Sequence, residues 1–176
     1  GIEPVGAGND ASEARAAVVT EVDGVRIAFL SYTHIPSPAW AATKDRSGVA
    51  WIDAETMPID IAAASAGADV VVVFFHFGIE GSLTPSDMQR EVAHAAIDAG
   101  ASLVLGSHPH VMQEVEAYEG GLIAYSLGNF VFDGFDDEPH ANESAILMVE
   151  LTPFGVDSWE LVPVVIVGGR PQLAAD

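Results

Sequence analysis

Cysteine is absent from the 176-residue sequence, and lysine occurs once, at Lys44. Without thiols the chain can form no disulfide and no thiolate metal site. The six lysines and arginines stand against 26 aspartates and glutamates, so the formal net charge is −20. A surface of this charge repels nucleic acid and anionic membranes, and we expect neither as a partner.

Long apolar runs are also lacking. The longest are the length of a strand, too short to cross a bilayer, so we expect no membrane span in this chain. No signal peptide is recognisable at the start, and an opening of Gly-Ile-Glu-Pro is typical of a mature chain, a trimmed chain or a fragment. At this length we expect a single domain over residues 1–176.

The first two thirds of the sequence alternate between strand and helix patterns. Asp23-Gly24 lies between two β-rich runs and predicts a hairpin. Thr56 and Thr84 are the predicted N-caps of two helices, the second with Pro85 in its first turn. Two successive β-α-β units follow from this pattern, which predicts a parallel sheet. The expected segments are strands 16–21 and 25–31, a loop over a site at 35–54, helix 56–66, strand 70–75, helix 85–99 and strand 103–105.

The last third indicates antiparallel strands that form a second sheet. Its β-rich runs are residues 111–118, 122–125, 145–151 and 159–167. Glu119-Gly120-Gly121 predicts a hairpin between the first two runs. The acidic segment 133–143 predicts a surface loop, and we expect the tail after Gly168 to fray.

Four histidines follow the predicted parallel strands: His34, His76, His108 and His110. The carboxyl ends of parallel strands meet at one edge of a sheet, where ligands bind, so we expect these imidazoles to converge. Imidazole is the commonest neutral metal ligand. Pro109 separates the last two and predicts a stiff turn with His108 extended. His94 lies opposite the apolar stripe of its helix and is expected at the surface.

Several sequence blocks occur in a recognisable order. They are Gly-Ala-Gly-Asn at 6–9, Glu-Ala-Arg at 13–15, His-Phe-Gly-Ile-Glu at 76–80, Pro85, Gln89-Arg90, Asp-Ala-Gly-Ala at 98–101, Gly-Ser-His-Pro-His at 106–110, Glu116 and Tyr-Ser-Leu-Gly-Asn-Phe-Val-Phe-Asp at 125–133. This set resembles the capsule-synthesis, poly-γ-glutamate-associated family known as CapA or PGA_cap, related to the calcineurin-like metallophosphatases. The resemblance implies an α/β fold, a metallophosphatase-like two-sheet sandwich (α/β/β/α), of which this chain is the C-terminal portion.

The resemblance also implies a metal site at one rim of the sandwich. His108 and His110 match the closing Gly-His-x-His motif of metallophosphatases, and His76 matches the lone histidine that precedes it. From the residues alone, three histidines with an open position could hold one zinc and activate a bound water. The family's Asp-x-His, Gly-Asp and Asn-His motifs are not found in these 176 residues.

Three explanations fit the missing motifs: the chain is a fragment, another chain completes the fold, or the site is degenerate. We expect a divalent transition metal, either zinc, manganese or iron. Two metals are expected when the missing N-terminal half is present, as a separate chain or as a cleaved fragment.

Four further residues are candidates for the site. Glu80 and Asn129 are predicted catalytic residues, which orient a ligand imidazole, exchange protons or contact substrate. Their structural alternatives are a surface acid and a turn-forming asparagine. Arg15 and His34 are predicted to bind substrate, Arg15 through a carboxylate or phosphate. An ordinary surface charge is the alternative for Arg15.

Two functions fit the sequence. The first is a metal-dependent hydrolase in which metal-activated water attacks an anionic phosphoester or the amide linkage of poly-γ-glutamate. The second is a non-catalytic polymer-handling or scaffold component of capsule synthesis or export. Family context predicts an extracytoplasmic or cell-surface location.

Overall fold

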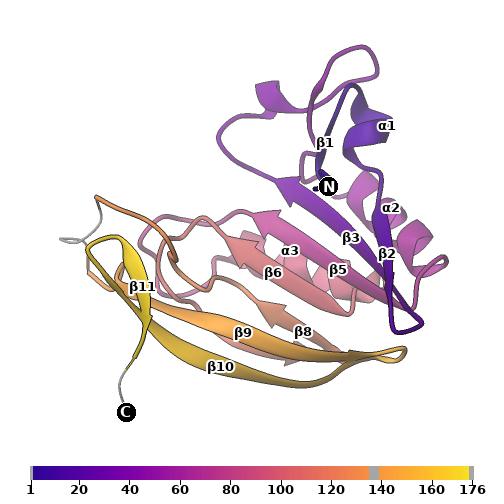
Figure 1. Ribbon diagram of the computed structural model, residues 1–176. Helices are drawn as coiled ribbons and strands as arrows, with labels where there is room; N and C mark the ends of the chain where they lie inside the picture. Colours follow the sequence, from indigo (N-terminus) through magenta and orange to yellow (C-terminus); the bar gives the residue numbers. More distant parts are fainter. Residues whose placement is uncertain (1, 135–138, 175–176) are drawn as a thin grey trace.

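A six-stranded mixed sheet forms the centre of the computed structural model, which describes residues 2–134 and 139–174 (Figure 1). The strand order is β2-β3-β5-β6-β8-β7, with the four inner strands parallel and both edge strands antiparallel. Each edge strand is joined to its neighbour by a two-residue hairpin turn, Asp23-Gly24 or Glu119-Gly120. Both residues of each turn have positive φ. The strands are β2 (Val18–Val22), β3 (Val25–Thr33), β5 (Val70–His76), β6 (Leu103–Ser107), β7 (Val115–Tyr118) and β8 (Gly121–Ala124).

Helices α2 (Thr56–Ser65) and α3 (Asp87–Asp98) cover one face of this sheet. The core between them is aromatic and aliphatic, with Tyr32, Phe75 and Phe77 among its largest fully buried side chains. Ile61 of α2 and Ala96 of α3 are also fully buried, which fixes the face that each helix turns to the sheet. Among the described residues, no helix is long and apolar enough to cross a membrane.

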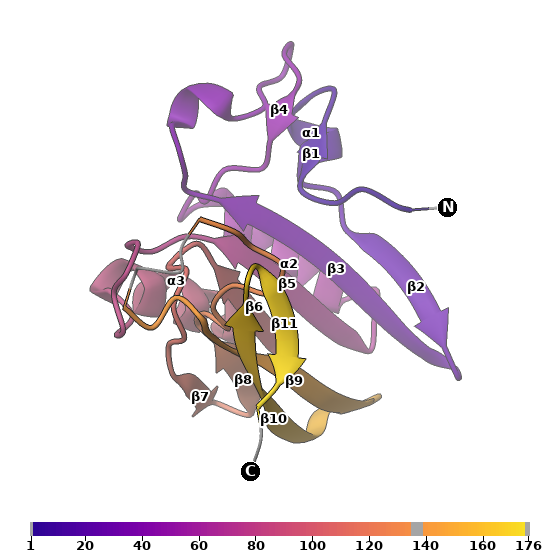
Figure 2. The ribbon, with the colours of Figure 1, turned by 60° about the vertical axis from the view of Figure 1, so that its left-hand side comes forward.

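A three-stranded antiparallel sheet covers part of the opposite face. It consists of β9 (Glu143–Thr152), β10 (Gly155–Val167) and β11 (Arg170–Leu173). Leu147, Val149 and Leu151 of β9 pack against a buried cluster on the main sheet that includes Val72 and Leu103. Figures 1 and 2 place this second sheet beside β6 and β8, with β2 and β3 lying outside it.

The remaining short elements lie beyond the carboxyl end of β3 (Figure 1). They are β1 (Ala7–Gly8), α1 (Ala11–Ala14), the 3-10 helix η1 (Pro38–Trp40) and β4 (Gly48–Val49), with β1 and β4 paired. The expected loop over residues 35–54 therefore contains short elements. Three layers of the predicted sandwich are present, and no described helix covers the outer face of the three-stranded sheet.

The predicted helix caps were wrong by a few residues. Ser86, rather than Thr84, is the N-cap of α3, and it forms a capping box with Gln89. In this box each side chain accepts the backbone N–H of the other residue, so two N–H groups at the helix start are satisfied. This gain outweighs the preference for proline in the first turn, on which the prediction of Thr84 as N-cap rested. Thr56 is the first residue of α2 rather than its cap, and the carboxylate of Asp53 accepts its backbone N–H at 2.8 Å.

Two predictions for the last third and the prediction for His94 of α3 were wrong. The β7–β8 hairpin joins the main sheet, because β8 pairs in parallel with β6. The tail after Gly168 does not fray at once, since β11 pairs with β10. His94 is not simply at the surface: its ring stacks on Tyr118 at a centroid distance of 3.8 Å. The predicted loop 133–143 lies in part outside the described residues.

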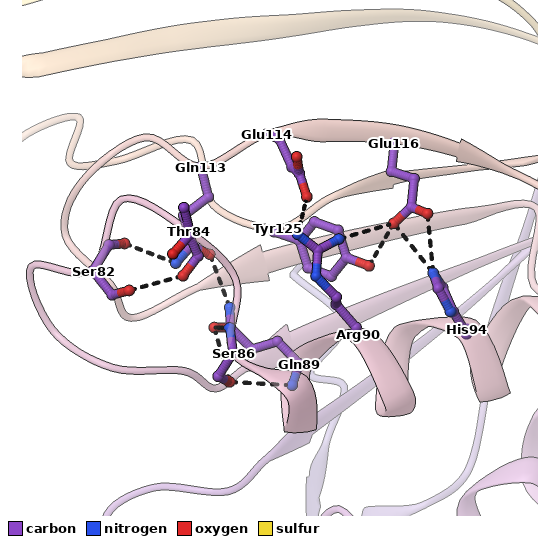
Figure 3. Close-up of polar contacts among 10 residues, drawn as sticks. All are labelled: Ser82, Thr84, Ser86, Gln89, Arg90, His94, Gln113, Glu114, Glu116 and Tyr125. Atoms are coloured by element: carbon purple, nitrogen blue, oxygen red, sulfur yellow. Dashed lines mark hydrogen bonds and ion pairs between the residues drawn. The ribbon is translucent and has the colours of Figure 1, made fainter.

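A polar cluster docks α3 against β7 and β8 (Figure 3). Glu116 is its centre: it accepts a hydrogen bond from the hydroxyl of Tyr125 at 2.7 Å and contacts His94 Nε2 at 3.1 Å. Arg90 pairs with Glu114 and lies 3.7 Å from Glu116. Burial acts to raise the pKa of Glu116, but the hydrogen bonds from Tyr125 and His94 and the nearby positive charges hold it below its usual range.

This depressed pKa predicts acid-sensitive stability. The folded-state pKa of Glu116 lies below the unfolded value, so its stabilisation is complete above the ordinary carboxylate pKa and is lost as pH falls through the folded value. We expect Glu116→Gln to lower the free energy of unfolding by roughly 1 kcal/mol at pH 7, and by progressively less below about pH 4.

Chemical denaturation across pH measures this difference. Glu21→Gln, at an exposed position on β2, is the matched control for the change in net charge. An equal pH dependence in both variants would contradict the assignment.

Candidate metal centre

The carboxyl ends of three parallel strands form one row in the sheet. Register pairs Thr33 of β3 with His76 of β5, and His76 with Ser107 of β6. The residue after each strand therefore leaves the sheet at the same edge. This confirms the expected rim, where the His76 imidazole and the turn after Ser107 lie side by side.

Glu80, His108 and His110 come together at this rim. One ligand atom from each lies within 4.8 Å of the other two, and Nε2 of His108 is 3.9 Å from Oε1 of Glu80. Two imidazoles and a carboxylate are typical donors for zinc and similar ions, whose bonds to such atoms are about 2.0–2.2 Å long. The donor set fits a divalent transition metal, with small movements of the exposed Glu80 side chain.

The turn that carries both histidines has an unusual backbone. His108 and His110 have φ of 104° and 60°, a region that residues other than glycine rarely adopt. The predicted extended conformation of His108 was therefore wrong. The Gly81 N–H donates to the Pro109 carbonyl at 2.8 Å, a long-range bond that helps to hold the turn. Each such residue stores on the order of 1–3 kcal/mol of strain, and residues of this kind cluster at functional sites.

His76 lies beside this group, its ring centroid 5.0 Å from that of His108. Its Nδ1 is 3.0 Å from the hydroxyl of Ser107, which is in turn 3.5 Å from the Phe75 carbonyl. When that hydroxyl donates to the carbonyl, its oxygen accepts from Nδ1–H, and Nε2 of His76 carries the lone pair.

Burial lowers the pKa of His76, and the neighbouring His108 and His110 lower it further. Burial also lowers the pKa of His108, against the opposing effect of Glu80. Both imidazoles therefore favour the neutral form, which is the form that coordinates a metal.

Asn129 fixes the orientation of His110. Its amide nitrogen donates to the carbonyls of His110 and Ala141 at 3.2 and 3.0 Å, which identifies Oδ1 as the atom that faces the ring. Oδ1 is 2.6 Å from Nδ1 of His110. An amide oxygen can only accept, so Nδ1 carries the proton and Nε2 is the basic nitrogen of His110.

The structure places Arg15 and His34 away from this group. Arg15 lies 3.4 Å from Asp60 of α2, whose carboxylate also accepts from the hydroxyl of Tyr32. The ring of His34 packs 5.3 Å from that of Trp51 and lines an apolar hollow between α2 and α3. Only the backbone of His34 approaches the rim, through a hydrogen bond to the His76 carbonyl.

Three residues near the site received no role from sequence reasoning. Ser107 contacts His76, and Gln89 and Gln113 are buried polar residues that bond to each other at 2.9 Å. Gln89 and Ser107 belong to recognised sequence blocks, which were the available signal. Nothing in the local pattern indicated Gln113.

A hollow of about 550 Å³ opens beside the metal group. Glu80 and His110 form part of its wall. None of its lining residues is a lysine or arginine, so the described residues offer an anionic group no direct cationic partner there. The other lining residues are Gly81, Leu83, Pro109, Val111, Gly134, Pro139, His140 and Ala141.

The fold is shared with solved phosphatases and nucleotidases. A novel phosphatase from Mycoplasma pneumoniae superposes with a TM-score of 0.60 at 12% identity, over 85% of this chain and 57% of that one. A putative 5′-nucleotidase from Staphylococcus aureus gives a TM-score of 0.57 at 16% identity, over 93% of this chain and 32% of that one. The predicted metallophosphatase-like α/β fold is confirmed.

Sequence relatives are considerably closer. The PGA biosynthesis protein CapA of Bacillus subtilis is 39% identical over 97% of this chain and 44% of its own length. The capsule biosynthesis protein CapA of Bacillus anthracis is 35% identical over 97% of this chain and 42% of its own length. The chain thus spans less than half the length of these relatives. Residues 1–134 match the family model for the bacterial capsule synthesis protein PGA_cap, and the chain belongs to that family.

Proposed function

We propose that this chain supplies the histidine-rich side of a metal-dependent hydrolase centre that acts in capsule synthesis. The observation that carries the proposal is the convergence of Glu80, His108 and His110 at one rim, beside His76. The fixed tautomer of His110 supports it, because a solvated turn does not require an amide acceptor on the ring.

His108 and His110 would hold the ion through imidazole nitrogens, with Glu80 as an oxygen ligand and His76 as a neighbouring ligand. A bound divalent ion supplies Lewis acidity and lowers the pKa of a coordinated water. Asn129 keeps Nδ1 of His110 protonated and the ring oriented. The Glu80 side chain is 65% exposed, so its second oxygen can also accept a proton from solvent or substrate.

The substrate classes that we propose are an anionic phosphoester and the amide linkage of poly-γ-glutamate. The names of the Bacillus relatives support a polymer of this kind, and the fold neighbours support a phosphoester. With a net charge of −20 and no lysine or arginine among the described residues that line the hollow, attraction of either anion depends on the bound metal. A capsule role places the protein at the cell envelope, and we propose an extracytoplasmic site.

A further polypeptide, equivalent to the part of the relatives outside the matched region, completes this centre in our proposal. It would be present as a separate chain or as a cleaved fragment. The main sheet carries apolar side chains that the three-stranded sheet leaves uncovered, above all Phe74, which is 40% exposed on the central strand β5. Val25, Ile27 and Phe29 on β3 are only half-buried on the same face. Covering this face would bury apolar surface and bring further ligands to the rim.

Metal binding provides the first test. Purified protein is expected to contain one equivalent of zinc, manganese or iron by elemental analysis, or two when intact mass shows the completing polypeptide. The double variant His108→Ala/His110→Ala removes two ligands, so its affinity is expected to fall by at least roughly 100-fold.

Near-equal metal content in wild type and double variant would overturn the site. Circular dichroism verifies that the variant is folded. His140→Ala is the matched control, because His140 lines the same hollow but is not in the metal group.

Hydrolysis provides the second test. The metal-loaded protein is offered a chromogenic phosphodiester, a phosphomonoester and a γ-glutamyl oligomer, and we expect turnover of at least one. If the His108→Ala/His110→Ala variant loses that turnover, the activity depends on the two histidines. Metal binding without turnover of any of the three would favour the polymer-handling alternative.

Asn129 gives a third prediction. Asn129→Leu removes the acceptor that holds His110 and leaves two backbone carbonyls without their donor. We expect metal affinity to fall roughly 10–100-fold, as for other residues that orient metal ligands. Isothermal titration with zinc measures it, and an unchanged affinity in a folded variant would show that Asn129 serves the turn alone.

A further inference from the structure

Glu80 is carried by a segment that has no regular secondary structure. Residues 77–86 connect the end of β5 to the N-cap of α3, with no strand or helix between them. Phe77 is fully buried and anchors the start of the segment in the core. Residues 78–84 are half-buried or exposed. The position of Glu80 therefore depends on bonds between this segment and other parts of the chain.

Two buried glutamines make those contacts (Figure 3). Gln89 is fully buried and Gln113 is 5% exposed. The Gln89 side-chain nitrogen donates to the side-chain oxygen of Gln113 at 2.9 Å, and the Gln113 nitrogen donates to the Ser82 carbonyl at 2.8 Å. At the other end, Oε1 of Gln89 accepts the backbone N–H of Ser86 at 3.0 Å.

The direction of every bond in this chain is determined. Ser86 N–H can only donate, so the Gln89 oxygen faces it and the Gln89 nitrogen must face Gln113. The Gln113 nitrogen is then turned to the Ser82 carbonyl, which can only accept. A directional chain of buried hydrogen bonds defines position more narrowly than apolar packing does.

Gly78 brings the start of the segment against the same amide group. Its φ is 107°, and a Cβ built there would lie 2.7 Å from the Gln89 amide. The backbone thus approaches Gln89 as closely as glycine allows. The middle of the segment is bonded to the histidine turn, because Gly81 N–H donates to the Pro109 carbonyl at 2.8 Å.

We propose that Gln89 and Gln113 are positioning residues that hold Glu80 against His108 and His110. The inference rests on the metal site proposed above. Gln89 fixes the ends of the segment at Gly78 and Ser86, and Gln113 fixes Ser82. Glu80 lies between these fixed points, and the Gly81–Pro109 bond sets its distance from the turn.

The experiment compares four variants with wild type. Gln113→Met removes the bond to Ser82 with little change in volume but leaves the Gln89 nitrogen buried without its acceptor. Gln89→Met/Gln113→Met removes both amide groups, and with them the bonds to the Ser82 carbonyl and from the Ser86 N–H, so we expect it to lose at least as much zinc affinity as Gln113→Met. Gly78→Ala adds a Cβ that would clash with the side-chain amide of Gln89. Arg90→Met is the matched control, because Arg90 follows Gln89 on α3 but pairs with Glu114 of the docking cluster.

Three quantities are measured on each protein: zinc affinity by chelator competition, amide hydrogen exchange at Gly81, and stability by denaturation. We expect the Gln113→Met, double-Met and Gly78→Ala variants to lose roughly 10–100-fold in zinc affinity and to exchange Gly81 faster. Arg90→Met is expected to lose stability with zinc affinity and Gly81 exchange unchanged.

The two glutamines would be merely structural if zinc affinity followed stability across all four variants, including Arg90→Met. Zinc affinity equal to that of wild type in the double variant would also overturn the inference. The competition is repeated with manganese and iron, and if wild type binds none of the three ions, the proposed metal site fails. The exchange of Gly81 then still decides whether the glutamines hold the segment.

Discussion

Parallel pairing of β3, β5 and β6 is the constraint on which the site depends. Because the register aligns Thr33, His76 and Ser107, each strand delivers its next residues to the same edge of the sheet. The buried apolar faces of β5 prevent a slip of this register, since a one-residue shift would turn Phe75 out of the aromatic core. Core packing therefore determines where the imidazoles lie.

The polar contacts around the rim form two separate systems. One surrounds the candidate metal site. In it, Asn129 accepts from His110, Ser107 contacts His76, and Gln89 and Gln113 bond to each other beside the segment that carries Glu80. The other is the docking cluster around Glu116, which attaches α3 to the edge of the sheet. They meet on adjacent residues of one helix. Substitutions at Gln89 and Arg90 of α3 can therefore separate effects on the proposed metal site from effects on stability.

Features with a local cause could be predicted from the sequence. The run of four valines and two phenylalanines at 70–75 predicts a buried strand, and Asp23-Gly24 and Glu119-Gly120 predict the hairpin turns, each with a glycine at its second, positive-φ position. Convergence of His76, His108 and His110 also followed from strand order alone. The family resemblance added the fold, which the relatives and the solved structures confirm.

Features set by tertiary contacts could not be predicted. The side chain of His34 leaves the rim because Trp51 and the two helices provide an apolar hollow for it. His94 was expected in solvent because it lies opposite the apolar stripe of its helix, but Tyr118 of the β7–β8 hairpin stacks on its ring. The backbone of His108 departs from the pre-proline preference because the turn is bonded to a segment 28 residues earlier, through Gly81 and Pro109.

The positive φ angles at His108 and His110 have a cost in stability. Both positions adopt a conformation that glycine reaches without steric penalty. Glycine at either position would relieve the backbone strain, so histidine there has a cost in local stability. Under the proposed metal site, this cost is the stability side of a stability–activity trade-off.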